Sequence, residues 1–340
     1  MSTAHLAMTH GEHGFIFLIT GAPGAGNGVT AAALMRRFPF GLHIPVDELR
    51  EWVVSGISQP VPEFTAETGR QFRLARGAAA QVAALYADAG FAVAVDDVIH
   101  EPDAEALVAL LAPRTVHKIF LQPTLDVALA RNADRTNKGF DTAVLADAIR
   151  GNHRSLGEQN RADLGWIVID NGALDVEQTV DAILESALQG IINFRRLSDR
   201  LITGGQPTEA ELALAAAAGT EVVINLGRLD PAYALPDERG TVAALGLIYE
   251  HIPVIWAEPT AADLDAFFAA LARHAGRRLF VHCAANYRAS AFNMLYRVLR
   301  LGWRIEDARP DMDAIWDPAA YPQWQAFIET ALGAGADRVE

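Results

Sequence analysis

The stretch RLFVHCAANYRASAF, residues 278–292, decides how the second half of this chain is interpreted. Its apolar run predicts a buried strand that ends at a His-Cys pair. Cys283 is the only cysteine in 340 residues, and Arg288 follows five positions later. Because residues 288–301 carry apolar side chains at helical spacing, the sequence predicts a strand, a short loop and a helix around one thiol.

This order of elements would place the thiol of Cys283 at the N-terminus of a helix, where backbone N–H groups bind oxyanions. The helix dipole and Arg288 would favour the thiolate, which can attack phosphorus while the guanidinium binds two oxygens. Ser290 is a candidate to hydrogen-bond the sulfur when it leaves. The other residues expected in this phosphate-binding loop are His282, which would support it, Ala284, Ala285, Asn286 and Tyr287. The alternative is that Cys283 is only a small hydrophobic side chain at a strand end.

A second loop, GAPGAGNG at 21–28, follows a predicted strand and precedes a predicted helix. Glycine-rich turns in this context cradle phosphates with backbone N–H groups. In the pattern G-x-x-x-x-G-K-[ST], Asn27 stands at the lysine position and Gly28 at the hydroxyl position. The candidate nucleotide-binding residues are Gly21, Gly24, Gly26, Asn27 and Gly28. The loop is either a nucleotide site with weakened contacts or a tight strand-to-helix turn.

Apolar runs alternate with helical stretches along the chain, which predicts mostly parallel sheets covered by helices. The expected strands are 15–20, 41–47, 91–97, 116–122 and 165–170, then 200–207, 221–227, 248–255 and 278–283. A predicted helix ends just before Gly190. We therefore expect two three-layer α/β domains, 1–189 and 190–340.

Composition narrows the class of protein. The net charge of −14 and the pI of about 5.1 argue against an extended nucleic-acid surface. No apolar run reaches the length of a membrane span, and the first residues lack the pattern of a secretory signal. A single cysteine suits a reducing compartment. These features predict a cytoplasmic protein with no membrane partner.

Residues from about 15 to 188 resemble the P-loop small-molecule kinases of the chloramphenicol phosphotransferase and zeta-toxin type. The resemblance is carried by the glycine loop and by HIPVDELR (43–50), AVDDVIH (94–100), LARNADRTNKG (129–139) and WIVIDNGALDVEQTVDAIL (166–184). It implies a P-loop NTPase-like parallel sheet with ATP and Mg²⁺ as cofactors. The substitutions at the lysine and hydroxyl positions leave open whether nucleotide is turned over, only bound, or neither.

The same resemblance implies roles for single residues. Asp47 would act as base toward a substrate hydroxyl, and Asp96 or Asp97 would assist Mg²⁺. The basic residues of the lid that would clamp phosphates are Arg131, Arg135 and Lys138. Each acid also fits an ordinary place, Asp47 as a helix cap and the adjacent pair as a strand-end turn.

Residues from about 191 to 332 resemble a bacterial branch of tyrosine and dual-specificity phosphatases. The matching pieces are LITGGQPTEAEL (201–212), EVVINL (221–226), ALPDE (234–238), HIPV (251–254), HCAANYRASAF (282–292) and DMDAIWDP (311–318). The resemblance implies a phosphocysteine intermediate and no cofactor for this domain. The aspartate that such enzymes use as general acid is not found after HIPV, where position 255 is Ile, so Glu258 is the candidate.

Two alternatives stay open. The four-residue gap between Cys283 and Arg288 also occurs in rhodanese-type sulfurtransferases, whereas the phosphatase pattern has five. The first domain could instead sense nucleotide and gate the phosphatase. The expected partner is a phosphorylated small molecule, a nucleotide or a phosphoprotein. The sequence predicts no oligomeric state.

Overall fold

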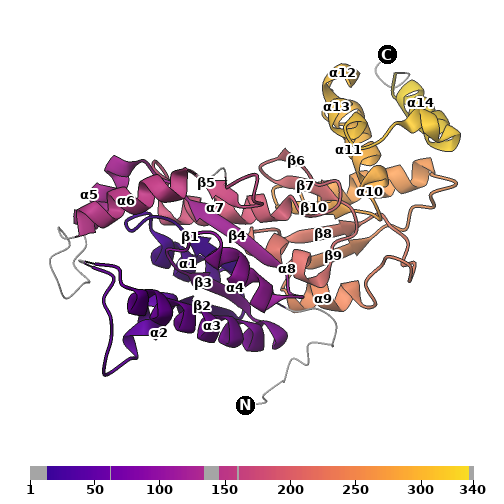
Figure 1. Cartoon of the computed structure of the whole chain (residues 1–340). Helices are drawn as coiled ribbons and strands as arrows, with labels where there is room; N and C mark the ends of the chain where they lie inside the picture. Colours follow the sequence, from indigo (N-terminus) through magenta and orange to yellow (C-terminus); the bar gives the residue numbers. More distant parts are fainter. Residues whose placement is uncertain (1–13, 62, 134–144, 159–160, 337–340) are drawn as a thin grey trace. The chain divides into compact units, whose positions relative to one another are not determined.

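The computed structural model describes residues 14–61, 63–133, 145–158 and 161–336. The chain divides into two compact units, Met1–Ala187 and Leu188–Glu340, which are described one at a time. Each holds one five-stranded sheet flanked by helices, which confirms the predicted α/β class (Figure 1).

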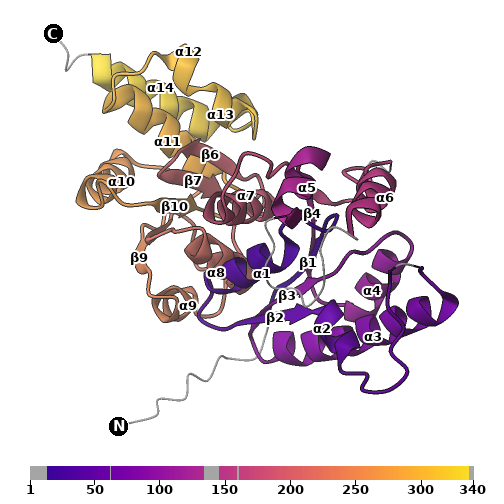
Figure 2. The same ribbon diagram turned by 90° about the vertical axis from the view of Figure 1, so that its left-hand side faces the viewer.

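The sheet of the N-terminal unit has the strand order β2-β3-β1-β4-β5, and all neighbouring strands are parallel. Its strands are β1 (Ile16–Thr20), β2 (Gly41–Pro45), β3 (Ala92–Asp96), β4 (Val116–Leu121) and β5 (Ile167–Ile169). The helices are α1 (Asn27–Met35), α2 (Val46–Glu51), α3 (Ala66–Asp88), α4 (Asp103–Leu111), α5 (Leu125–Ala133), α6 (Ala146–Gly157) and α7 (Val176–Leu188). Figure 2 shows α1 on one side of the strands and α3 with α4 on the other. This covering on both faces is why β1 is wholly buried.

The sheet of the C-terminal unit has the order β6-β7-β10-β8-β9. Its strands are β6 (Arg195–Ser198), β7 (Leu201–Gly204), β8 (Val222–Asn225), β9 (Ile248–His251) and β10 (Leu279–His282). The strands β7, β10, β8 and β9 run parallel, and β6 is an antiparallel edge strand. The edge strand was not predicted, because its four residues alternate between half-buried and exposed and include two arginines.

The helices of this unit are α8 (Glu209–Ala217), α9 (Glu238–Ala244), α10 (Ala261–Arg273), α11 (Tyr287–Leu299), α12 (Ile305–Ala308), α13 (Pro310–Asp313) and α14 (Pro322–Ala336). Helix α11 follows the central strand β10 and is buried along most of its length. It packs on the sheet on one side and on α12, α13 and α14 on another (Figure 1). Such burial fixes the position of its N-terminus, where the cysteine loop arrives.

Several predicted strands end earlier than expected. The strand predicted at 41–47 stops at Pro45, and α2 begins at Val46, so Asp47 lies in the first turn of a helix. The strand predicted at 248–255 stops at His251, because Pro253 has no N–H to donate to a ladder. Only after β2 does a helix begin within the range predicted as strand.

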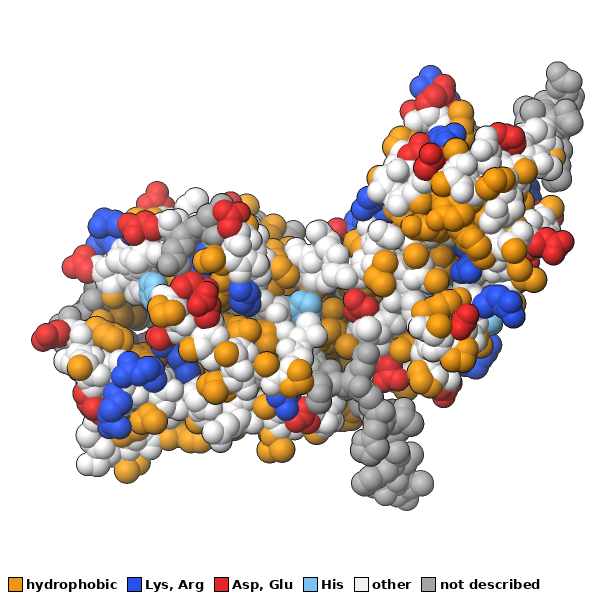
Figure 3. Space-filling view, turned by 45° about the vertical axis from the view of Figure 1, so that its right-hand side comes forward, with side chains coloured by type: hydrophobic (Ala, Val, Ile, Leu, Met, Phe, Trp, Pro, Cys, Tyr) orange, Lys and Arg blue, Asp and Glu red, His pale blue; other side chains and the backbone are white. Residues whose placement is uncertain are grey.

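On the face shown in Figure 3, acidic and basic side chains of the described residues are interspersed rather than gathered into one basic surface. Among the same residues, no helix combines the length and the hydrophobicity that a membrane span requires.

Candidate active site around Cys283

The cysteine loop joins the central strand of the C-terminal unit to its central helix. Strand β10 is buried throughout, and Cys283 follows it with 1% of its surface exposed. Asn286 caps α11 with a φ of 63°, a left-handed conformation that Asn tolerates better than most residues. Its amide Nδ2 donates to the carbonyl oxygen of Asn193 at 2.6 Å and to Oγ1 of Thr203 at 3.0 Å. The turn that brings the helix N-terminus toward the cysteine is therefore fixed from two sides.

The loop backbone is also held from outside. The N–H of Cys283 donates to the carbonyl of Gly204 at 3.4 Å, and the N–H of Gln206 donates to the carbonyl of Ala284 at 3.1 Å. Nδ2 of Asn193 donates to the carbonyl of Ala285 at 3.0 Å. The carbonyls of Ala284 and Ala285 are therefore occupied by donors from other segments. The first N–H groups of α11 have no partner within the helix, so they can bind a ligand.

Arg288 is the second residue of α11 and is only 7% exposed. Its guanidinium carbon lies 5.7 Å from the ring centre of Trp256. In the described part of the chain its Nε has no hydrogen-bond partner and its guanidinium forms no ion pair. A buried cation without an anion is costly, so this arginine is prepared for a negatively charged ligand.

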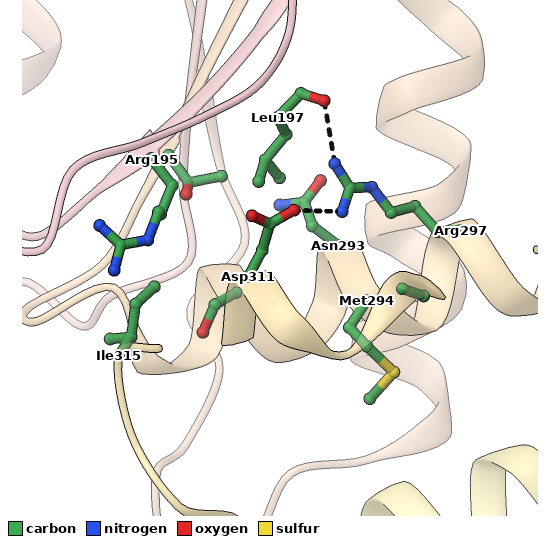
Figure 4. Close-up of a pocket in the computed structure, with 10 residues that line it drawn as sticks. Arg195, Leu197, Asn293, Met294, Arg297, Asp311 and Ile315 are labelled. Atoms are coloured by element: carbon green, nitrogen blue, oxygen red, sulfur yellow. Dashed lines mark hydrogen bonds and ion pairs between the residues drawn. The ribbon is translucent and has the colours of Figure 1, made fainter. Parts of the chain in front are cut away.

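Another arginine of the same helix shows the usual arrangement. Arg297 is equally buried at 7%, but its Nη1 donates to Oδ2 of Asp311 at 2.5 Å and its Nη2 to the carbonyl of Leu197 at 2.9 Å (Figure 4). The contrast shows that burial on α11 does not by itself leave an arginine unpaired. Of the two, only Arg288, at the N-terminal end beside the cysteine loop, finds no such partner in the part of the chain that the structure describes.

Ser290 is buried on α11 and is engaged away from the sulfur. Its Oγ donates to the carbonyl of Tyr287 at 3.0 Å and accepts from Nε1 of Trp316 at 3.1 Å. These bonds hold the first turn of α11 against the Trp316 ring, on which Tyr287 stacks at 5.0 Å. The role of Ser290 in helping the sulfur to leave stays a prediction.

Glu258 lies on the segment between β9 and α10, and its side chain is exposed. Its N–H donates to the carbonyl of Ile255 at 3.1 Å, which closes a turn around Trp256. The carbonyl of Trp256 accepts from Nε1 of Trp324 at 2.9 Å. This segment is thus anchored two residues before Glu258, with the Trp256 ring facing Arg288. The assignment of Glu258 as general acid also stays a prediction.

The sequence interpretation missed a buried carboxylate behind the loop. Glu238, the first residue of α9, is 2% exposed, and its Oε1 lies 2.7 Å from Nε2 of His282. Burial raises its pKa, but the hydrogen bond and charge of His282, with bonds from Gln206 and Tyr249, outweigh this and keep the pKa below its ordinary value. The motif ALPDE (234–238) contains this acid, but an Asp-Glu pair before a helix is also the ordinary pattern of an exposed cap.

The glycine loop of the N-terminal unit is closed on itself. Nδ2 of Asn27 donates to the carbonyl of Gly21 at 2.9 Å, so the side chain at the lysine position faces the loop backbone. Arg131 donates to the carbonyls of Ala25 at 3.4 Å and Asn171 at 2.9 Å. Gly24 and Gly26 adopt the positive φ angles that such a turn needs. Arg135 and Lys138, also assigned to the lid, lie outside the described residues.

The acids expected to assist Mg²⁺ have other partners. Oδ1 of Asp96 lies 2.5 Å from Nε2 of His43, and Oδ2 of Asp97 accepts from Nε of Arg76 at 2.5 Å. Burial raises the pKa of Asp97 to about 6. The charge and hydrogen bond of Arg76 lower this pKa, and the negative charge of Asp47 raises it further. Where the structure is described, no three or more His, Cys, Asp or Glu side chains gather as a metal site.

These residues do not fit a Mg²⁺–triphosphate group. A Cβ added at Gly28 would lie 3.4 Å from Oδ2 of Asp96, but glycine offers no hydroxyl for the metal. Asn27 supplies no cation. The P-loop interpretation of the N-terminal unit, with Asp47 as base, stays a prediction.

Comparison with known proteins bears on the cysteine site. No protein-family model and no curated protein matches the chain. A solved structure named "Putative phosphatase (DUF442)", from Shewanella putrefaciens CN-32, is 39% identical over 44% of this chain and 94% of its own length, with a TM-score of 0.40. At that identity, over nearly the whole of the other protein, sequence similarity shows the family. Over that part, the chain belongs to the DUF442 family of this phosphatase-named protein. We call the C-terminal unit, which carries the cysteine loop, the phosphatase-like domain.

Two more distant likenesses are found among solved structures. TpbA of P. aeruginosa is 20% identical over 43% of this chain and 91% of its own, with a TM-score of 0.35. The tunicamycin resistance protein of Deinococcus radiodurans is 20% identical over 51% of this chain and 95% of its own, with a TM-score of 0.38. Both identities are too low to say anything of function.

Proposed function

We propose that the phosphatase-like domain hydrolyses phosphoric monoesters through a phosphocysteine on Cys283. Arg288 and the N-terminal N–H groups of α11 would bind the phosphoryl oxygens. The substrate would be a phosphorylated small molecule, a nucleotide or a phosphoprotein. No step of this reaction uses a metal or the glycine loop of the other unit.

In the first step the Cys283 thiolate attacks phosphorus, the S–P bond forms and the bond from phosphorus to the ester oxygen breaks. The leaving oxygen takes a proton, for which Glu258 is the candidate donor. In the second step a water attacks phosphorus and gives a proton to the Glu258 carboxylate left by the first step, the S–P bond breaks, and inorganic phosphate leaves the restored thiolate. Throughout, Arg288 would bind two phosphoryl oxygens with its planar fork.

The observation that carries the proposal is the state of Arg288. The residue is 7% exposed, its guanidinium has no anion among the described residues, and it belongs to the first turn of a 13-residue helix. The only thiol of the chain lies five residues before it on the same loop. Buried donors that converge without an acceptor are typical of an oxyanion site.

The experiment is a hydrolysis assay with the full-length protein on aryl phosphates, nucleotides and phosphopeptides, in the presence of a chelator. We expect slow release of inorganic phosphate from aryl phosphates. A parallel assay with thiosulfate and cyanide covers the alternative. Thiocyanate formation with a persulfide on Cys283, and no phosphate release from any substrate, would favour sulfur transfer instead.

A further inference from the structure

Glu238 is a carboxylate with 2% of its surface exposed, close to the strand that leads into the cysteine loop. A buried carboxylate is unfavourable unless several donors satisfy it. A fold that needed only a helix start at this point could have left the acid in water, as Asp237 is left while it accepts from the N–H of Gly240 at 2.9 Å. The burial of Glu238 therefore calls for an explanation in terms of what it binds.

Besides Tyr249, three donors from three different segments converge on this carboxylate. Nε2 of His282 lies 2.7 Å from Oε1, Nε2 of Gln206 lies 2.9 Å from Oε2, and Nδ2 of Asn225 lies 3.2 Å from both oxygens. The residues come from the end of β10, the segment after β7 and the end of β8. Glu238 thus ties together the carboxyl ends of three neighbouring strands.

Each of the three donors also touches the loop that holds the thiol. His282 immediately precedes Cys283. The backbone N–H of Gln206 donates to the carbonyl of Ala284 at 3.1 Å. Oδ1 of Asn225 accepts from the N–H of Gly227 at 2.6 Å, and a Cβ added at Gly227 would lie 3.6 Å from Cα of Cys283. A shift of any of the three would be passed directly to the cysteine loop.

We propose that Glu238 is a positioning residue that sets the geometry of the oxyanion cradle through His282, Gln206 and Asn225. This inference rests on the proposed function, since the cradle is the phosphate site of that reaction. A carboxylate suits the role because it only accepts hydrogen bonds, and all three neighbours donate. An amide at the same position would turn a donor toward donors.

The alternative roles of Glu238 predict opposite effects on anion binding. If the carboxylate acted only as a buried negative charge, its neutralisation would strengthen the binding of an oxyanion to the loop. If it positions the cradle, its loss misplaces the N–H groups and Arg288 and weakens that binding. The substitution Glu238→Gln, which keeps the shape of the side chain, separates these outcomes.

The phosphatase-like domain offers a matched control. Oε1 of Glu250 on β9 lies 2.7 Å from Nε2 of His274, the same distance as in the Glu238–His282 pair. Glu250 also accepts from Arg273, the last residue of α10. Because successive side chains of a strand point to opposite faces, Glu250 lies on the face of β9 opposite to Tyr249, which joins the network around Glu238. Glu250→Gln therefore perturbs a carboxylate–histidine pair in the same domain without touching the cysteine loop.

The test measures tungstate affinity by calorimetry and kcat on an aryl phosphate for full-length wild type, Glu238→Gln and Glu250→Gln. We expect both quantities to fall about ten- to hundredfold in Glu238→Gln, as for a small misplacement of reacting groups, and to stay unchanged in Glu250→Gln. Both variants should lose thermal stability. Unchanged or stronger tungstate binding by folded Glu238→Gln would overturn the proposal.

Two further readings keep the test decisive. If Glu238→Gln does not fold, Gln206→Leu is the substitute, because it removes one of the three donors at a partly exposed position. Smaller losses of tungstate affinity and kcat are then expected. Wild-type tungstate affinity in Gln206→Leu would count against the positioning role. If wild type binds tungstate but releases no phosphate, the proposed function is wrong, while the comparison of affinities still decides the role of Glu238.

Discussion

Arg288 and Arg297 lie on the same helix and are equally buried at 7%, but among the described residues only Arg297 has an anionic partner, Asp311, at 2.5 Å. The two arginines therefore have different roles. The pair at Arg297 joins α11 to α13, whereas the unpaired guanidinium of Arg288 faces Trp256 at the N-terminal end of the helix. This difference leads to opposite expectations for the two positions.

Arg288→Met should weaken phosphate binding about ten- to hundredfold, because charge-assisted hydrogen bonds to a ligand are lost. Its melting temperature should stay level or rise, since an unpaired buried charge is removed. Arg297→Met should leave phosphate binding unchanged and lower the free energy of unfolding by about 1–2 kcal/mol, discounted because Asp311 is partly exposed. Calorimetry and thermal melts check both variants. A large loss of stability in Arg288→Met would mean that this arginine is structural.

Glu258→Gln should slow poor leaving groups more than good ones if Glu258 protonates the leaving oxygen. The loss for phenyl phosphate is expected on the order of 10²-fold or more, and for p-nitrophenyl phosphate much less, because nitrophenolate leaves without a proton. The measurement is the ratio of kcat values for the two esters in wild type and variant. Equal losses on both esters would exclude Glu258 as the acid.

Asn27→Lys should tighten binding of ATP to the N-terminal unit about ten- to hundredfold, since lysine brings the cation that the loop lacks and frees the Gly21 carbonyl. Titration calorimetry at millimolar ATP with Mg²⁺ measures wild type and variant side by side. Absence of heat from both proteins would show that residues 21–28 form a turn and nothing more.

His117 gives the N-terminal unit a pH dependence. Burial lowers its pKa to about 4 from an ordinary value of 6.5, and its ring stacks on Phe17 at 5.2 Å. Its Nε2 has no hydrogen-bond partner where the chain is described. Because the folded state resists protonation, the stability linked to this group is complete above pH 6.5 and is lost as the pH falls toward 4.

His117→Phe keeps the aromatic contacts and removes the titrating group. Its free energy of unfolding relative to wild type should therefore be higher at pH 5 than at pH 7.5, by up to about 1.4 kcal/mol for each pH unit. Thermal melts of both proteins at the two pH values measure this difference. The raised pKa of Asp97 affects stability in the opposite direction, but it is common to both proteins and cancels in the difference. A difference independent of pH would mean that His117 already titrates normally.

How far the sequence predicted the structure depended on whether the signal was local. The strand, loop and helix around Cys283 follow from an apolar run and a helical period, and the structure places β10 and α11 there. Edge strand β6 was not predicted. It pairs with β7 through backbone hydrogen bonds, and its four residues show no apolar run or alternation of apolar and polar residues that would indicate a strand.

The site shows the same division. Cys283 and Arg288 are only five positions apart in sequence, so their spacing could be read directly. Glu238 is 44 residues from His282, and only the fold of β8, α9 and β10 brings them to 2.7 Å. Its acid looks like any helix cap until its burial is known. Asn27 was read as a missing cation, but its bond to the Gly21 carbonyl could not be foreseen from a residue type.

The most direct test of the account is the turnover of p-nitrophenyl phosphate by full-length wild type and Cys283→Ser, with chelator present and with tungstate binding measured on both. The account predicts metal-independent turnover by wild type, none by Cys283→Ser, and tungstate binding in both, because Arg288 and the N–H groups of α11 remain. Turnover by Cys283→Ser at the wild-type rate would contradict it, since the only thiol of the chain would then be a packed side chain and not the nucleophile.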